Sequence, residues 1–253
     1  MMSGKRWGYV VQFFCLLVFL GMSPFLIKMD GMTAMTEKSH IGTAINVVVG
    51  TKEINHTYFY QNVSDEVKPV VALTFDDGPN ASSTPILLDG LKERKVRATF
   101  FLIGENVEKD ENEKIVKRMY EEGHLIGNHT YTHCNLSKLE TGEAKKELEQ
   151  TDTVIEKITG KQPVFVRAPY GELPVDSEQD LNRIYIGWTV DPLDWMTEDT
   201  GAVVKTVVEE INPGDVILLH DCYPSSVQAA IRIVDLLQGK GYEFVTVDHL
   251  IMD

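Results

Sequence analysis

The chain has 253 residues, of which 43% are hydrophobic and 25% charged, a composition typical of a globular protein. Its formal net charge of −14 at pH 7 argues against nucleic acid as a partner, because the phosphate backbone is also negative. Only Cys134 and Cys222 lie beyond the N-terminal apolar segment, too few for a disulfide scaffold. The length fits one domain of roughly 180 residues with an appendage better than two full domains.

The first predicted element is an uncharged stretch at residues 7–27, preceded by Lys5 and Arg6. It is long enough to cross a bilayer as a helix, and the basic residues ahead of it favour a cytoplasmic N-terminus. A cleaved signal peptide is the alternative, but the apolar run is long for one and the cleavage site is poor. We therefore expect residues 1–27 to be a cytoplasmic tip and a single-pass membrane anchor. Either reading places the rest of the chain outside the cytoplasm.

Residues 28–68 are polar and mixed, with a short apolar patch at 45–49, and we expect a stalk with room for one strand. Within residues 69–253, apolar strand-like runs alternate with segments of helical spacing. Strands are expected at 70–75, 98–103, 124–127, 164–166, 184–190, 216–219 and 242–247. Helices are expected at 84–95, 113–122, 143–158, 203–211 and 227–237. Strands alternating with helices predict parallel pairing and an α/β domain.

Polar clusters follow several of these strands at the point where each strand ends. In α/β barrels and open parallel sheets, the carboxyl ends of the strands form the ligand-binding rim. We therefore expect five clusters to converge on one site: Asp76 and Asp77, His129 and His133, Arg167, residues 191–195, and His220 with Asp221.

The first two clusters have the composition of a metal site. Adjacent carboxylates such as Asp76 and Asp77 are costly at the end of a buried strand unless something positive neutralises them. The alternative is a solvated Asp-Gly-Pro turn. Two histidines four residues apart on a helical turn, His129 and His133, share one face and can hold one ion. With Asp77 they form a set of two histidines and one carboxylate, which leaves positions open for water and substrate.

The remaining clusters each have an ordinary explanation as well. Arg167 could orient one carboxylate and lower its pKa, or it could form a surface ion pair. Trp195 is the kind of residue that more often belongs to a core. A histidine such as His220, directly after an apolar strand, is more often a rim residue with satisfied hydrogen bonds.

Taken together, the motifs resemble those of the polysaccharide deacetylases of carbohydrate esterase family four, which share the NodB homology domain. TFDDGP, HTYTH, RAPYG, DPLDW and LLH stand in the family's order, and the resemblance covers residues 69–253. The family's fold is a distorted (β/α) barrel with fewer than eight complete units, and we expect the same here.

The resemblance also implies a role for each motif residue. Asp77, His129 and His133 would bind a divalent metal, with zinc expected and cobalt as the alternative. Asp76 would be the general base oriented by Arg167, and His220 the general acid oriented by Asp194. The backbone N–H of Tyr170 would complete the oxyanion hole, while Trp195 and Leu218 would line the pocket for the acetyl methyl group.

Two motif positions vary within the family, and the second of them bears on the substrate. Ala168 replaces a proline found in many members, a conservative change. Asp77 is present, whereas muramic-acid deacetylases of this superfamily typically replace it, which favours N-acetylglucosamine as the sugar. We expect a monomer acting on an N-acetylated glycan polymer of the envelope, namely peptidoglycan. Chitooligosaccharides, acetylxylan and an inactive wall-binding role are the alternatives.

Cys134 and Cys222 could meet as a disulfide, but free thiols are expected.

Overall fold

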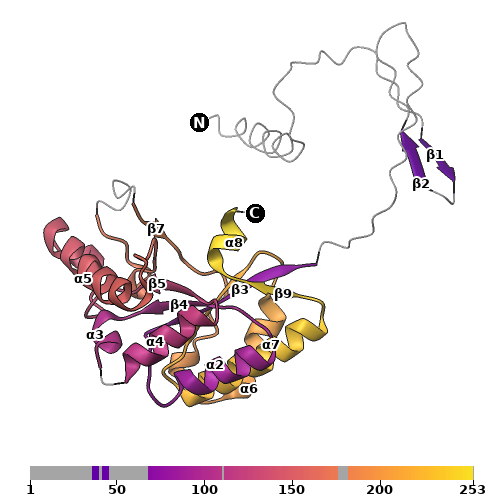
Figure 1. Ribbon diagram of the computed structural model, residues 1–253. Coiled ribbons are helices and arrows are strands. Elements are labelled where there is room, and N and C mark those ends of the chain that lie inside the picture. The colour runs from indigo at the N-terminus through magenta and orange to yellow at the C-terminus, as the bar shows by residue number, and fades with distance from the viewer. Residues whose placement is uncertain (1–35, 40–41, 46–67, 110, 176–181, 253) are drawn as a thin grey trace, which may run out of the picture. The chain divides into compact units, whose positions relative to one another are not determined.

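The computed structural model describes the chain in two compact units, Met1–Asp65 and Glu66–Asp253 (Figure 1). The residues described are 36–39, 42–45, 68–109, 111–175 and 182–252. In the first unit β1 (Thr36–Ser39) and β2 (Gly42–Ile45) pair in antiparallel fashion. The predicted membrane anchor lies outside the described residues. Within those residues, no helix combines the length and the apolar character that crossing a bilayer requires.

The second unit is built on one parallel sheet, as the alternation of strands and helices predicts. The strand order is β7-β6-β5-β4-β3-β8, and β9 pairs with the first half of β3. The strands are β3 (Val70–Asp76), β4 (Thr99–Leu102), β5 (Leu125–Asn128), β6 (Phe165–Val166), β7 (Ile184–Tyr185), β8 (Val216–His220) and β9 (Glu243–Val245). Each overlaps one of the strands expected from the sequence.

Strand β3, which lies between β4 and β8, is buried on both faces, which explains its almost continuous apolar sequence. Because side chains alternate along a strand, Val71, Leu73 and Phe75 join the main hydrophobic core. Ala72 belongs to a smaller cluster on the opposite face, and Thr74 and Asp76 share that face by the same alternation. The strand thus carries an apolar row toward one side and two polar side chains toward the other.

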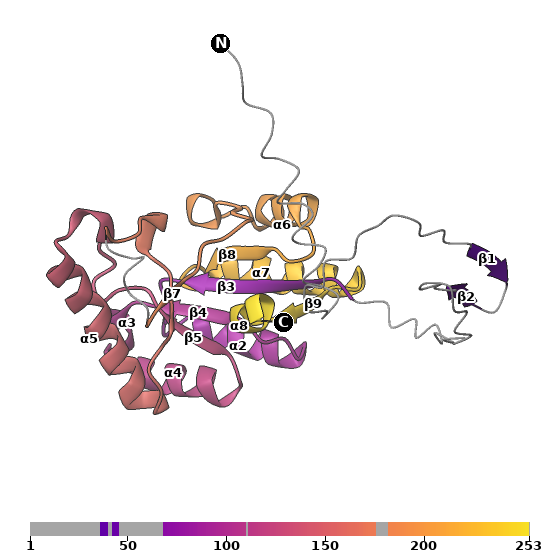
Figure 2. The ribbon, with the colours of Figure 1, turned by 90° about the horizontal axis from the view of Figure 1, so that it is seen from above.

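Helices cover the sheet in the order of the strands. The contacts run from α6 to α7, α2, α4 and α5, and Figure 1 shows α2, α4 and α7 together on one face. The small helix α8 lies on the other face against β3 (Figures 1 and 2). Their bounds are α2 (Thr84–Glu93), α3 (Gly104–Val107), α4 (Asn112–Glu121), α5 (Thr141–Thr159), α6 (Thr200–Glu210), α7 (Pro224–Gly239) and α8 (Val247–Met252).

Helix α5 shows how local sequence sets such boundaries. Glu140 and Glu143 form a capping box at its start. The helix ends at Thr159 and is capped by Gly160, whose φ of 73° is a left-handed conformation that glycine adopts without strain. The helices α3 and α8 are short and were not expected from the sequence.

The segment 184–190 makes the sheet curl. Its first two residues form β7 and pair with β6, whereas Val190 pairs with Ile217 of β8 at the opposite edge. One short segment therefore reaches both edges of the sheet. The sheet is a curled half-barrel of parallel strands. The expectation of a single strand over 184–190 is wrong, because the chain leaves one edge before it joins the other.

Candidate metal centre and active site

The carboxyl ends of β3, β5, β6 and β8 bring most of the polar clusters together. Asp76 and Asp77 come at the end of β3, His129 directly after β5, Arg167 directly after β6, and His220 at the end of β8. The cluster at 191–195 follows the Val190 bridge instead of a strand end. It joins the site through the short helical turn η4 (Asp194–Met196).

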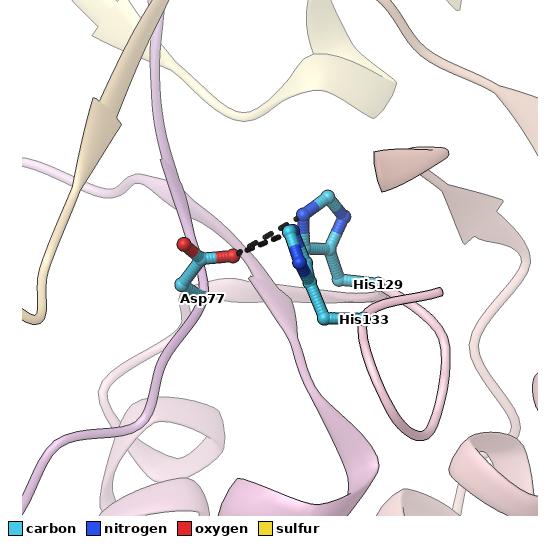
Figure 3. A group of neighbouring side chains, drawn as sticks. All are labelled: Asp77, His129 and His133. Atoms are coloured by element: carbon cyan, nitrogen blue, oxygen red, sulfur yellow. Dashed lines mark ion pairs between the residues drawn. The ribbon is translucent and has the colours of Figure 1, made fainter. Parts of the chain in front are cut away.

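Asp77, His129 and His133 converge on one point (Figure 3). Asp77 Oδ1 lies 3.4 Å from His129 Nε2 and 3.2 Å from His133 Nε2. One ligand atom from each residue lies within 4.8 Å of the other two. This spacing allows all three atoms to contact one ion, and it leaves the remaining coordination positions open.

The chemistry of the three groups also fits a metal ion. Asp77 Oδ1 is buried without a hydrogen-bond partner, a costly state that a cation would relieve. Burial raises the pKa of the Asp77 carboxyl, but the imidazoles of His129, His133 and His220, when protonated, outweigh burial and hold the pKa below its usual value. Burial lowers the pKa of His133, which favours the neutral imidazole that a metal requires.

The two histidines do not lie on a helix. Residues 129–133 form an irregular loop after β5, in which Thr130 and His133 have positive φ values of 65° and 59°. The prediction that the two histidines lie on a helical turn is therefore wrong, although their rings are adjacent with centroids 5.0 Å apart. A loop can bring residues four apart together as well as a helical turn does.

A backbone carbonyl selects the tautomer of His129. Its Nδ1 lies 2.7 Å from the carbonyl oxygen of Arg167, so Nδ1–H donates there. The lone pair of Nε2 is then directed toward Asp77. Metal-binding histidines usually have such a partner behind the ring, which fixes its orientation.

Arg167 is fully buried on the inner face of the sheet and binds Asp76. Its Nη1 donates to Asp76 Oδ1 at 2.8 Å and to Thr74 Oγ1 at 2.7 Å. Its guanidinium also lies 4.3 Å from the centroid of the Phe101 ring. The other oxygen of Asp76, Oδ2, is 3.7 Å from His129 Nε2. One oxygen is thus held by arginine while the other faces the proposed metal position.

His220 stands opposite Asp76, because the two residues are register partners on β8 and β3. Asp194 Oδ1 lies 2.8 Å from His220 Nδ1, and Asp194 Oδ2 accepts the His220 backbone N–H at 2.8 Å. Burial lowers the pKa of His220, but the Asp194 bond and the charges of Asp76 and Asp77 raise it to about 9. The imidazolium therefore persists at neutral pH.

The three residues expected to hold the substrate lie around this centre. Tyr170 has a φ of 62°, and its phenol oxygen is 3.3 Å from His133 Nδ1. Leu218 is buried on the face of β8 that also carries His220. Trp195 is half exposed and lines an open pocket of about 590 Å³ together with Tyr223.

Two further residues lie beside the centre: Tyr223, which the sequence did not single out, and Asp221, which the sequence placed in one cluster with His220. The ring of Tyr223 packs edge-on to His220 with centroids 6.3 Å apart. Asp221 is fully buried, and Thr84 Oγ1 donates to it at 2.6 Å. Burial raises the pKa of Asp221 to about 7, against the effect of that hydrogen bond. A Cβ on Gly78 would lie 2.5 Å from both carboxyl oxygens of Asp221, so only glycine fits there.

Cys134 and Cys222 are both free thiols, as expected from the sequence.

Comparison with known proteins gives a consistent result. The polysaccharide deacetylase family model matches residues 63–186. A peptidoglycan-N-acetylglucosamine deacetylase of Bacillus cereus is 42% identical over 190 residues, which are 72% of this chain and 68% of that protein. PdaC of Bacillus subtilis, a peptidoglycan-N-acetylmuramic acid deacetylase, is 35% identical over 92% of this chain, which spans half of PdaC.

Solved structures agree with these relatives. The structure of PdaC is 39% identical with a TM-score of 0.70, over 74% of this chain and 91% of the PdaC chain. A family 4 acetyl xylan esterase from Clostridium thermocellum, in complex with a cobalt ion, is 33% identical with a TM-score of 0.68. That match covers 72% of this chain and 90% of the esterase.

Proposed function

Because the chain belongs to the polysaccharide deacetylase family, we propose that it hydrolyses the acetamide of N-acetylglucosamine residues in peptidoglycan and releases acetate. One observation carries the proposal. Asp77, His129 and His133, three side chains of the kind that bind metals, lie beside a carboxylate held by arginine. The register partner of that carboxylate is a histidine held by aspartate. The Bacillus cereus relative, which is named for this activity, supports the choice of sugar and polymer.

The metal would be held by Asp77, His129 and His133, and we propose zinc, with cobalt as the alternative. Both ions accept imidazole and carboxylate ligands. Bound there, a divalent ion would polarise the acetyl carbonyl and lower the pKa of a water molecule. The cobalt ion in the related esterase supports the alternative.

The protein's own groups would move the protons. Asp76 is held in place by Arg167 and would accept a proton from the attacking water. His220 is positively charged at neutral pH and would donate a proton to the departing amine, which leaves poorly otherwise. Asp194 would keep the His220 ring oriented and charged. The backbone N–H of Tyr170 would stabilise the developing oxyanion, and Trp195 and Leu218 would contact the acetyl methyl group.

The proposal is tested by acetate release from purified peptidoglycan, with and without a chelator. Digestion of the treated polymer with a muramidase, followed by mass spectrometry of the disaccharides, identifies the sugar that lost its acetyl group. We expect loss from N-acetylglucosamine. The second candidate function is deacetylation of N-acetylmuramic acid, which the likeness to PdaC favours. Loss of acetyl groups from that sugar would support it.

Chitooligosaccharides and acetylxylan remain the alternative substrates, and their acetate release should be compared in the same assay. An inactive wall-binding protein is the alternative outside enzymes. The presence of every proposed ligand and of both proton-transfer residues argues against it. Zinc-loaded protein that binds the wall and leaves its acetyl groups intact would support it.

We also propose that a single-pass helix at residues 7–27 anchors the protein with its deacetylase domain outside the cytoplasm, as a monomer. The support is the uncharged stretch of 21 residues after Lys5 and Arg6. Protease added to intact cells should digest the domain, and deletion of residues 1–27 should move the protein out of the membrane fraction. A protease-resistant domain, or a membrane fraction unchanged by the deletion, would contradict the proposal.

A further inference from the structure

The loop at residues 129–133, called here the histidine loop, carries two of the three proposed metal ligands. It is neither helix nor strand, so its backbone groups need partners elsewhere. Thr130 and His133 both have positive φ, a conformation that costs energy for residues other than glycine. Such a loop keeps its shape only where the surrounding structure holds it.

Two of its supports come from neighbouring backbone. The N–H groups of Gly104 and Glu105, at the start of α3, donate to the carbonyls of Thr130 and Tyr131 at 3.0 Å each. The N–H of Thr130 donates to Asn128 Oδ1 at 2.8 Å. These bonds hold the first half of the histidine loop.

The second half is held by a carboxylate on helix α5. Glu147 Oε2 accepts the backbone N–H of Tyr131 at 3.0 Å and that of Thr132 at 2.8 Å. The Thr132 hydroxyl lies 3.1 Å from each carboxylate oxygen of Glu147. Hydrogen bonds from backbone amides to a carboxylate are stronger than those between neutral groups. Thr132 is exposed to solvent, so its position depends on this contact more than on packing.

We propose that Glu147 is a positioning residue for the metal centre, which clamps the histidine loop so that His129 and His133 face one point. It contacts no proposed ligand atom and acts through the backbone of the two residues between the histidines. The inference rests on the proposed function, because it assumes that the two histidines bind a metal there.

The clamp is tested by metal affinity, measured by competition for zinc with a chromophoric chelator. Glu147→Ala should weaken zinc binding about 10- to 100-fold, the range usual for residues that hold metal ligands in place. Glu147→Gln keeps an acceptor oxygen for the two amides and should recover most of that loss. Glu156→Ala removes an exposed carboxylate from the same helix and should bind zinc like the unaltered protein.

A general loss of structure is separated from loss of the clamp by two further measurements. Saturating zinc should restore most of the turnover of Glu147→Ala, because the proton-transfer groups are untouched. In the metal-free unaltered protein, the amides of Tyr131 and Thr132 should be protected from hydrogen exchange, and this protection needs no variant to fold. Protection should fall in Glu147→Ala while that of the sheet amides persists.

Zinc affinity unchanged by Glu147→Ala would overturn the proposal, as would rapid exchange of both amides in the unaltered protein. These readouts need no deacetylation. A protein that binds zinc through the clamp and releases no acetate would therefore refute the proposed function and leave the clamp standing.

Discussion

The two adjacent carboxylates, Asp76 and Asp77, have different surroundings although they are chemically alike. Asp76 is the last residue of β3 and continues the alternation that places Thr74 on the inner face, beside Arg167. Asp77 has left the strand with a φ of 70°, which turns it toward His129 and His133. One backbone change thus separates a proposed base from a proposed ligand.

Replacing Asp76 by Asn should abolish most of the turnover and spare the metal. The amide cannot accept the proton of the attacking water, and loss of a general base costs about 10²- to 10⁴-fold. Acetate release and zinc content of the same sample measure the two effects. An Asp76→Asn protein that keeps full turnover would end the assignment of Asp76 as the base.

The pH dependence should report His220. Its pKa is raised to about 9, so the acid form persists up to that pH and the rate should fall above it. Asp194→Asn removes the negative charge that helps to raise this pKa, and the falling limb should move to lower pH by at least about one unit. A limb that stays in place would show that another group titrates there.

The same ion pair affects stability with a definite sign. The folded-state pKa of His220 lies above the ordinary value of 6.5, so its contribution is complete below pH 6.5 and is lost as the pH rises through 9. In urea unfolding, Asp194→Asn should therefore cost more free energy at pH 6 than at pH 10. An equal cost at both pH values would contradict the link.

Sequence reasoning found residues that lie in motifs and missed residues that act from a distance. The position of polar residues at the ends of apolar runs was enough to locate Asp76, Asp77 and His220. Glu147 is one glutamate among several on α5, and nothing local distinguishes it. Thr74 could have been found, because it shares the strand face of Asp76 two residues away.

At the scale of elements, hydrophobic periodicity predicted which strands and helices exist better than it predicted where each one begins and ends. All seven predicted strands have a counterpart in the sheet, because apolar runs bounded by polar clusters are a strong signal. The prediction of one strand over 184–190 was wrong because this apolar run is shared between two sheet edges. The prediction of a helical turn at the histidine loop was wrong because a spacing of four residues does not distinguish a helical turn from a loop.

Helix α2 provides a test of the outer layer. Leu88 is fully buried against the main core, whereas Ile86 on the same helix is 62% exposed. Leu88→Ala should lower the free energy of unfolding by about 2–5 kcal/mol through lost burial and the cavity left behind. Ile86→Ala is the matched control and should change it by less than about 1 kcal/mol. Urea unfolding measures both, and equal losses would contradict the packing described here.

At the scale of the whole domain, the apolar core and the polar site occupy different parts of the sheet. The main core lies between the sheet and the surrounding helices, while the proposed metal ligands lie at the carboxyl ends of the strands. We therefore expect the strand ends of this domain to keep their structure without a bound ion.

Removal of the metal should stop catalysis and leave the fold intact. A chelator should abolish acetate release, and zinc should restore it. The far-ultraviolet circular dichroism of the chelated protein should match that of the loaded protein, because no core residue depends on the ion. Collapse of the secondary structure on chelation would show that the metal is structural.

Arg167 also binds the segment that reaches across the curled sheet, through bonds to the carbonyls of Ile186 at 3.2 Å and Gly187 at 2.9 Å. A single side chain thus serves chemistry and architecture at once. Exchanging this arginine would therefore release Asp76 from its partner and remove an internal brace of the half-barrel in one step.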